Sequence, residues 1–241
     1  MPDAPIIFWE NEARLKLAQA VSRLFQEKKD EPILLLVSGG SVLKALDFID
    51  LPTGANITIS LLDDRFSREP AVNNFLQLTQ TKFFEKAVSA GAEFISSLPE
   101  EGETLEAVAS HWEKKFQTWD RTFPANRTII AIMGMGEDGH TAGLMPFPEN
   151  PRKFAELFEN DRKWIVGYDA GKKNQFPLRL TSSVNFIEEM IDRVFVYVVG
   201  KEKKKILQAV LKSRDLAEYP ACVIHRLKKV EIYTDIKIED F

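Results

Sequence analysis

The chain has 241 residues, of which 44% are hydrophobic, and its formal net charge at pH 7 is −4. This length and apolar content suffice for a sizeable buried core. The negative charge argues against nucleic acid as the main partner, because proteins that bind it usually present a basic face. No apolar run approaches the roughly 20 residues of a membrane-spanning helix. The sequence therefore predicts a globular protein that binds neither nucleic acid nor membrane.

The cysteine content and the first residues of the chain bear on the cellular compartment in which the protein is expected. Cys222 is the single cysteine, which excludes an intrachain disulfide and disfavours a cysteine-based metal site. A single cysteine fits a reducing environment. Residues 1–6 lack the basic and then apolar layout of a signal peptide. We therefore expect a cytoplasmic protein.

The first half of the chain alternates between helix and strand patterns. Apolar residues recur every four positions from Ala13 to Phe25, which predicts an amphipathic helix over residues 11–29. Five consecutive apolar residues, 33–37, predict a strand buried on both faces. The same reading continues with a helix at 42–49, a strand at 57–62, a helix at 72–87, a weak strand at 93–95 and a helix at 103–119.

The second half continues this alternation. The expected elements are strand 128–132, helix 154–158, strand 164–168, helix 182–190, strand 194–199, helix 202–212 and strand 230–234. No internal repeat and no linker rich in Pro, Gly or Ser interrupts the chain, so we expect one domain over residues 1–241. Strands separated by helices pair in parallel through right-handed crossovers. The predicted fold is therefore α/β: a mostly parallel, open, Rossmann-like sheet with helices on both faces.

Polar residues follow four of the predicted strands. The segments are Ser38-Gly39-Gly40-Ser41, Asp63-Asp64-Arg65, Asp138-Gly139-His140 and Gly200-Lys201-Glu202-Lys203. Ligands of open α/β sheets bind beyond the carboxyl ends of the strands. These segments therefore predict a single site at one edge of the sheet.

The double glycine after the first buried strand suits an anion. Gly39 and Gly40 leave backbone N–H groups free at the start of a predicted helix, where phosphate binds readily. An ordinary turn with Ser41 as the helix cap would give the same pattern. The segment is not a P-loop, because the Gly-Lys-Ser/Thr ending is absent.

Three cationic segments are candidates for holding that anion. Arg65 can bind an oxyanion or phosphate through its planar fork, or it can form a salt bridge with Asp63 or Asp64. Arg179 lies between apolar neighbours, which allows burial near an anion, although arginine is usually at the surface. In the lysine-rich run 201–205 we expect at most one lysine to contact a ligand.

His140 is the candidate for acid–base chemistry. It lies in a glycine-rich loop two residues after Asp138 and can act as a general base near neutral pH. A structural histidine bonded to the local backbone is the alternative. His111 is expected to face solvent, and His225 has no helpful neighbours. No Cys, His and Asp spacing resembles a metal site.

These motifs together resemble a known family. Residues 134–146, Gly-Met-Gly-Glu-Asp-Gly-His-Thr-Ala-Gly-Leu-Met-Pro, resemble the Gly-x-Gly-x-Asp-Gly-His-Thr-Ala-Ser-Leu-Phe-Pro signature of the 6-phosphogluconolactonase family. That family shares a superfamily with glucosamine-6-phosphate deaminase. Over most of the chain, further segments match its phosphate loop, its Asp-Glu-Arg and following Asn, its Arg-x-Thr and its Gly-x-x-Lys: Ser38–Ser41, Asp63–Arg65, Asn74, Arg179–Thr181, and Gly200 with Lys203.

The resemblance implies a fold, a reaction and a site. The fold would be a three-layer sandwich of the NagB/RpiA type. The reaction would be hydrolysis of 6-phospho-D-glucono-1,5-lactone to 6-phospho-D-gluconate, a step of the oxidative pentose phosphate pathway, without a cofactor or metal and in a monomer or weak homodimer. The family pattern places phosphate on Gly39, Gly40, Ser41, Arg179 and Lys203, the sugar on Asp63 and Asn74, and the general base at His140. Asp138 would orient this histidine, and Arg65 would stabilise the oxyanion or bind the sugar.

Departures from the pattern bear on the shape of the sugar pocket. Gly143 and Met145 stand where Ser and Phe are usual, Asp64 replaces Glu, and Ser67-Arg68 replaces Val-Pro.

Three other functions are alternatives to lactone hydrolysis. A deaminase would continue after the histidine as Ile-Ala-Phe-Asn-Glu-Pro, and that glutamate is missing here. A non-catalytic sugar-phosphate sensor of the same fold usually carries a further DNA-binding region. A dinucleotide-dependent oxidoreductase needs its glycine fingerprint after the first strand.

Overall fold

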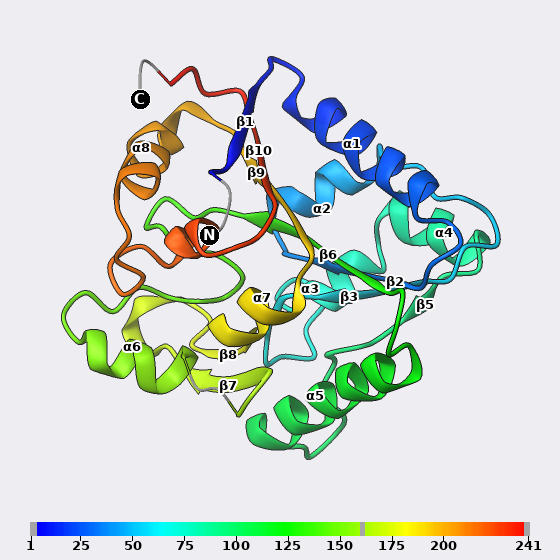
Figure 1. Ribbon diagram of the computed structural model, residues 1–241. Coiled ribbons are helices and arrows are strands. Elements are labelled where there is room, and N and C mark those ends of the chain that lie inside the picture. The colour runs from blue at the N-terminus through cyan, green and yellow to red at the C-terminus, as the bar shows by residue number, and fades with distance from the viewer. Residues whose placement is uncertain (1–3, 160–161, 239–241) are drawn as a thin grey trace.

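In the computed structural model, which describes residues 4–159 and 162–238, a seven-stranded parallel sheet forms the centre of the molecule (Figure 1). Met1 to Asp3, part of the segment compared with a signal peptide, lie outside the described residues. The strands of this large sheet are, in spatial order, β1 (Ile6–Trp9), β10 (Val230–Thr234), β9 (Arg193–Val198), β6 (Thr128–Gly134), β2 (Ile33–Val37), β3 (Ile57–Leu61) and β5 (Glu93–Phe94).

Helices cover both faces of the large sheet. On one side lie α1 (Ala13–Glu27) and α2 (Ser41–Leu46), and on the other lie α5 (Leu105–Thr122) and α7 (Val184–Met190) (Figure 1). The indole N–H groups of Trp112 and Trp119 on α5 donate to the hydroxyls of Ser60 and Thr58 on β3, at 3.1 and 3.0 Å. These bonds satisfy polar atoms in an otherwise apolar interface. The α/β class with helices on both faces is confirmed.

A second, three-stranded sheet was not predicted. This small sheet is antiparallel and consists of β4 (Asp63–Arg65), β8 (Leu178–Ser182) and β7 (Ile165–Asp169). Periodicity could not find β4 and β8, because β4 has only three residues, all charged, and β8 buries polar side chains. The expected strand 164–168 exists as β7, but it pairs in this sheet rather than in the parallel one. The edge strand β1 was also missed.

The single helix expected at 72–87 is wrong. The structure has two helices there, α3 (Asn74–Leu78) and α4 (Lys82–Ser89). Thr79 and Thr81 separate them, because their hydroxyls donate to the carbonyls of Leu76 and Leu78 at 2.8 and 2.7 Å. The hydroxyl of Thr81 also accepts from the N–H of Phe84, which caps α4. Such local side-chain bonds compete with helix continuation.

The rest of the chain adds short elements and completes one core. The remaining helices are α6 (Pro151–Phe158) and α8 (Lys204–Lys212), with 3₁₀ turns at Gly171–Lys173, Lys201–Lys203 and Pro220–His225. Buried apolar side chains from both sheets and their helices form one hydrophobic cluster. Within residues 4–159 and 162–238, no helix has the length and apolar character needed to cross a membrane.

Candidate active site

The site lies where the strand order of the large sheet reverses. From β2 the chain proceeds to β3 and β5 on one side, and it later returns to β6, β9 and β10 on the other. The loops that follow β2 and β6 therefore diverge at the carboxyl edge and leave room between them, as at the ligand sites of doubly wound sheets.

A cavity of about 210 Å³ occupies this position. It collects side chains and backbone from both sheets and from the 3₁₀ turn after β9. Of the predicted site residues, only Asp138 does not line it, and that residue instead contacts His140. Those that do are Gly39, Gly40, Ser41, Asp63, Arg65, Asn74, His140, Arg179 and Lys203.

The double-glycine loop packs directly against Asn74. A Cβ at Gly39 would lie 2.3 Å from the Asn74 Oδ1 atom, so any side chain there would displace the Asn74 amide. Gly40 has a φ of 67° and is the residue just before α2. The Asn74 amide donates to the carbonyl of Asp63 at 3.1 Å, which ties the loop after β2 to the small sheet.

Four buried polar atoms on the cavity wall lack a hydrogen-bond partner among the described residues. They are Ser38 Oγ, Arg65 Nε, Asn74 Oδ1 and Arg179 Nε. Buried polar atoms are rarely left unpaired, and such atoms in a cavity indicate a missing ligand or water. Two guanidinium donors, a hydroxyl and an amide acceptor suit a molecule that carries both anionic oxygens and hydroxyl groups.

The two arginines are held differently. Arg179 is 3% exposed, and its Nη2 lies 3.3 Å from Asp63 Oδ2. Arg65 donates from Nη1 to the carbonyl of Val72 at 2.8 Å. Over residues 4–159 and 162–238 Arg65 has no carboxylate within ion-pair distance, so the salt bridge with Asp63 or Asp64 considered above is absent. Its charge therefore remains available to a ligand.

Asp64 was overlooked as a candidate, yet it organises this wall of the cavity. Its carboxylate is fully buried and accepts from the backbone N–H groups of Arg65, Asn74 and Phe75 and from the Ser97 hydroxyl, at 2.7, 2.6, 3.2 and 2.7 Å. Burial raises the pKa of Asp64 to about 6, although these hydrogen bonds oppose the rise. Asp64 thereby fixes the backbone of two cavity residues without lining the cavity itself.

His140 and Asp138 form a close pair at the cavity mouth. His140 Nδ1 lies 2.5 Å from Asp138 Oδ1, which also accepts from the backbone N–H of His140 at 3.1 Å. Burial alone would raise the pKa of Asp138, but the hydrogen bonds and charge of His140 outweigh it and hold this pKa below its ordinary value. An ionised Asp138 keeps the proton on Nδ1, so Nε2 is the nitrogen free to accept one.

Glycines make room for this pair and explain one departure from the family pattern. A Cβ at Gly136 would lie 2.1 Å from His140 Nδ1. At Gly143, φ is 76° and a Cβ would lie 2.6 Å from the Asp63 Cβ. A serine at position 143 would therefore be both strained and in collision with the small sheet. The backbone at Gly143 lies closer to Asp63 than a side chain at position 143 would permit.

The remaining candidates lie as follows. Lys203 lines the cavity, whereas Lys201, Lys204 and Lys205 do not. His111 Nδ1 lies 2.7 Å from Glu103 at the surface, and His225 Nε2 lies 2.8 Å from the carbonyl of Val210, away from the cavity. In the part of the chain that the structure describes, no three His, Cys, Asp or Glu side chains are grouped to hold a metal ion. The absence of a cofactor stays a prediction.

Comparison with known proteins decides the family. Residues 10–233 match the family described as glucosamine-6-phosphate isomerases/6-phosphogluconolactonase. The chain belongs to this family. A 6-phosphogluconolactonase of Helicobacter pylori strain J99 is 29% identical over 213 residues, which cover 84% of this chain and 83% of that protein. One of Xylella fastidiosa strain Temecula1 is 27% identical over 230 residues, 90% of each chain.

Solved structures of the family share the fold. A 6-phosphogluconolactonase from Shewanella baltica superposes with a TM-score of 0.77 at 22% identity, covering 97% of this chain and 98% of that one. A putative 6-phosphogluconolactonase from Neisseria gonorrhoeae gives 0.75 at 23% identity, covering 95% and 99%. The NagB/RpiA-type fold predicted from the motifs is thus confirmed.

Proposed function

We propose that this protein hydrolyses 6-phospho-D-glucono-1,5-lactone to 6-phospho-D-gluconate in the oxidative pentose phosphate pathway. The observation that carries the proposal is one cavity whose wall carries His140, which is paired with Asp138, together with buried arginine, hydroxyl and amide atoms that lack a hydrogen-bond partner among the described residues. A phosphorylated polyhydroxy ester presents the anion, the hydroxyls and the electrophilic carbonyl that these groups suit. The relatives named as 6-phosphogluconolactonases support the same reading.

In this proposal the phosphate binds at the end of the cavity formed by the double-glycine loop. Backbone N–H groups of Gly39 and Gly40 and the hydroxyl of Ser41 donate to its oxygens, and Arg179 and Lys203 neutralise its charge. Asp63 and the Asn74 Oδ1 atom accept hydrogen bonds from sugar hydroxyls. Binding at the phosphate, remote from the reacting bond, positions the lactone carbonyl near His140.

The chemistry that we propose needs one base and one cation. His140 Nε2 takes a proton from water, whose oxygen attacks the lactone carbonyl carbon. Arg65 stabilises the negative charge that develops on the carbonyl oxygen. When the carbonyl re-forms, the bond to the ring oxygen breaks and His140 returns its proton to that oxygen. Asp138 keeps the imidazole oriented and in the correct tautomer throughout. No cofactor takes part.

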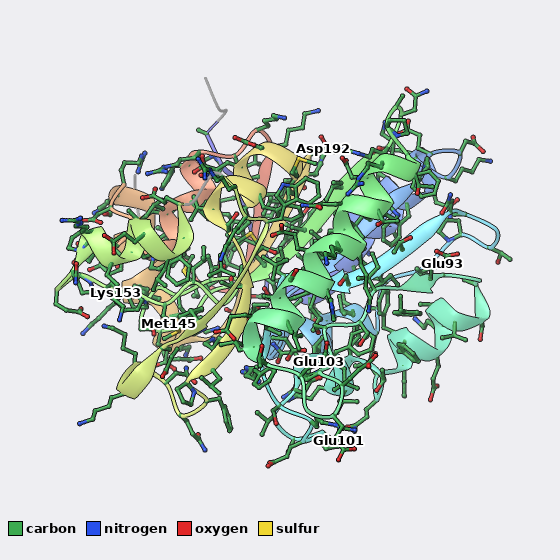
Figure 2. All side chains as sticks on the ribbon, turned by 90° about the horizontal axis from the view of Figure 1, so that it is seen from below. Glu93, Glu101, Glu103, Met145, Lys153 and Asp192 are labelled. Carbon is green, nitrogen blue, oxygen red and sulfur yellow. The ribbon has the colours of Figure 1, made fainter. Side chains whose placement is uncertain are left out.

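The deaminase alternative is weakened at one position. Met145, which is labelled in Figure 2, stands where deaminases carry the glutamate that assists the histidine. Its relative exposure is 1%. Ammonia release from glucosamine 6-phosphate would test it directly. A regulatory sensor would bind phosphosugars without turnover, whereas the hydrogen bond between His140 and Asp138 favours catalysis. The oxidoreductase alternative finds no support in the match to the family.

The decisive experiment compares lactone hydrolysis by the wild type, His140→Ala and His111→Ala, with the spontaneous opening subtracted. Removing a general base lowers kcat by about 100-fold or more. His111 lies at the surface on α5 and serves as the matched control, so its variant should keep wild-type activity. Equal rates for the wild type and a folded His140→Ala variant would refute the mechanism. Absence of activity in all three would favour the sensor.

We further propose that the chain forms one domain, acts in the cytoplasm and is a monomer or weak homodimer. The single hydrophobic cluster that joins both sheets supports the one-domain organisation. Sedimentation equilibrium at micromolar concentrations measures the oligomeric state, and a stable tetramer would contradict this proposal. One cooperative unfolding transition is expected for a single domain.

A further inference from the structure

A strained turn follows His140 directly. The N–H of Leu144 donates to the carbonyl of Thr141 at 2.8 Å, and the two residues between them have positive φ, 48° at Ala142 and 76° at Gly143. Positive φ at both central positions defines a type I′ turn. Ala142 pays a steric penalty in this conformation, and such strain persists only where the surroundings hold it in place.

Two buried hydroxyls of the small sheet hold this turn. The Thr181 hydroxyl on β8 donates to the carbonyl of Ala142, and the Tyr168 hydroxyl on β7 donates to the carbonyl of Gly143 at 2.5 Å. Thr181 is fully buried and Tyr168 is 4% exposed. Burial raises the pKa of Tyr168, so its hydroxyl stays protonated and remains a donor.

These anchors determine where the N–H of Gly143 points. The peptide bonds of the described residues are trans, so this N–H is directed opposite to the Ala142 carbonyl that Thr181 binds. Ala142 and Gly143 line the cavity, whereas Thr181 and Tyr168 do not. The hydroxyls therefore occupy the carbonyl side of this peptide from outside the cavity, and the N–H side is left for a ligand. Among residues 4–159 and 162–238, nothing accepts a hydrogen bond from the Gly143 N–H.

We propose that the backbone N–H of Gly143 is an oxyanion donor for the lactone carbonyl, and that Thr181 and Tyr168 position it. This inference rests on the proposed lactonase function. His140 and Gly143 line the same cavity three residues apart. In this inference, a carbonyl carbon within reach of water on His140 presents its oxygen to this N–H. A fixed donor of this kind, acting beside Arg65, stabilises charge that develops only in the transition state. Gly143 would thus touch the reacting atoms, while the two hydroxyls act through the turn.

The test uses paired variants of Thr181 in the full-length protein. Thr181→Val keeps the branched shape that suits β8 but releases the Ala142 carbonyl, whereas Thr181→Ser keeps a hydroxyl. Affinity is measured with 1,5-anhydro-D-glucitol 6-phosphate, which has the ring and phosphate of the substrate but no carbonyl. We expect kcat to fall about tenfold or more in Thr181→Val, with less than a twofold change in the affinity for this analogue. Thr181→Ser should recover most of kcat.

If Thr181→Val fails to fold, Tyr168→Phe provides an independent test. This variant should also lower kcat. Unchanged kcat in folded Thr181→Val or Tyr168→Phe would overturn the inference. A parallel loss of analogue affinity, or no recovery in Thr181→Ser, would also overturn it by assigning these residues a general structural role. Absence of lactone hydrolysis in the wild type would instead refute the proposed function, and the two failures are therefore distinct.

Discussion

Individual glycines decide how closely the catalytic groups approach one another. Gly39, Gly136 and Gly143 each occupy a place where a Cβ would lie within 2.6 Å of a neighbouring cavity or active-site side chain. The neighbours are Asn74, His140 and Asp63, respectively. A separation below 3 Å forces one of the two groups to move. Each of these glycines is therefore needed because it leaves space for a neighbouring side chain, and not because it makes the chain flexible.

Gly136→Ala is expected to abolish most of the activity. The added methyl group would occupy the position of the imidazole ring, because its distance to His140 Nδ1 would be 2.1 Å. The ring must then leave Asp138, and the catalytic tautomer is lost. Lactone hydrolysis should fall about 100-fold or more. Glu137→Ala, at an exposed neighbouring position, is the control and should retain activity. Full activity of Gly136→Ala would contradict the packing described here.

Gly143→Ser restores the residue usual in the family and is nevertheless expected to be harmful. An L-residue at a φ of 76° costs about 1 kcal/mol, and contact with Asp63 adds to this penalty. Urea unfolding should show lower stability, and displacement of Asp63 from Arg179 should weaken sugar-phosphate binding. A variant as stable and active as the wild type would show that the turn relaxes freely.

At the scale of elements, the small sheet supplies what the large sheet cannot. Its strands β4 and β8 carry Asp63, Arg65 and Arg179 across from the glycine loops. The buried carboxylate of Asp64 fixes the link between β4 and α3 by accepting four hydrogen bonds. Asp64, which does not line the cavity, thus holds in place the strand that carries Arg65 into it.

Asp64 gives a pH-dependent contribution to stability with a definite sign. Its folded-state pKa of about 6 exceeds the reference value of 3.8, so between these values the folded state binds more protons than the unfolded state. The contribution of Asp64 is fully present below about pH 4 and is lost as the pH rises through 6. When the pH is lowered from 7 to 5, the free energy of unfolding of the wild type should rise by about 1 kcal/mol relative to that of Asp64→Asn.

Urea denaturation at the two pH values measures this change. Asp50→Asn, a substitution of an exposed aspartate, is the matched control and should change with pH as the wild type does. A wild-type stability that falls relative to Asp64→Asn on acidification would mean that the carboxylate has a lowered pKa instead.

At the scale of the whole molecule, the cavity joins segments that lie far apart in the chain. The loops after β2 and β6, the small sheet and the turn after β9 meet only because the order of the large sheet brings them to one edge. The last segment begins at Gly200, which has a φ of 102°, and its N–H donates to Asp235 at 2.9 Å. This turn brings Lys203 to the cavity wall.

Lys203→Gln is expected to raise KM for the lactone by about tenfold with little change in kcat. The lysine neutralises phosphate, which is remote from the reacting carbonyl, so ground and transition states lose binding alike. Lys201→Gln removes a cation from the same 3₁₀ turn outside the cavity and is the control. Raised ionic strength should narrow the difference between Lys203→Gln and the wild type. Equal KM values for the two variants would remove Lys203 from the phosphate site.

Much of the fold could be predicted from local sequence patterns. The bounds of β2 agree with the prediction, and the α1, β6, β9 and β10 regions were recognised, because continuous apolar runs and four-residue spacing are strong signals. The break between α3 and α4 was missed because threonine hydroxyls, not an apolar pattern, end the helix. β4 and β8 were missed because most of their buried residues are polar and are satisfied only by tertiary contacts.

The candidate site divides in the same way. His140, Asp138, the double glycine and the arginines were identified because glycine-rich loops after strands restrict the chemistry that can occur there. The roles of Asp64, Tyr168 and Thr181 were not. Asp64 and Thr181 stand in segments that match family motifs, but a motif does not show which groups a side chain contacts. Their importance comes from carbonyl and N–H groups contributed by other segments.

The sequence by itself determined the α/β class, the family and the chemical character of the site, since local periodicity and short motifs encode these. Only the tertiary structure decided which charges are free and which are paired: Asp63 binds Arg179, and Arg65 is left for a ligand. It also decided that Gly143 must be glycine and that two distant hydroxyls hold its turn. Those features depend on contacts between residues more than 20 positions apart, which no local pattern in the chain records.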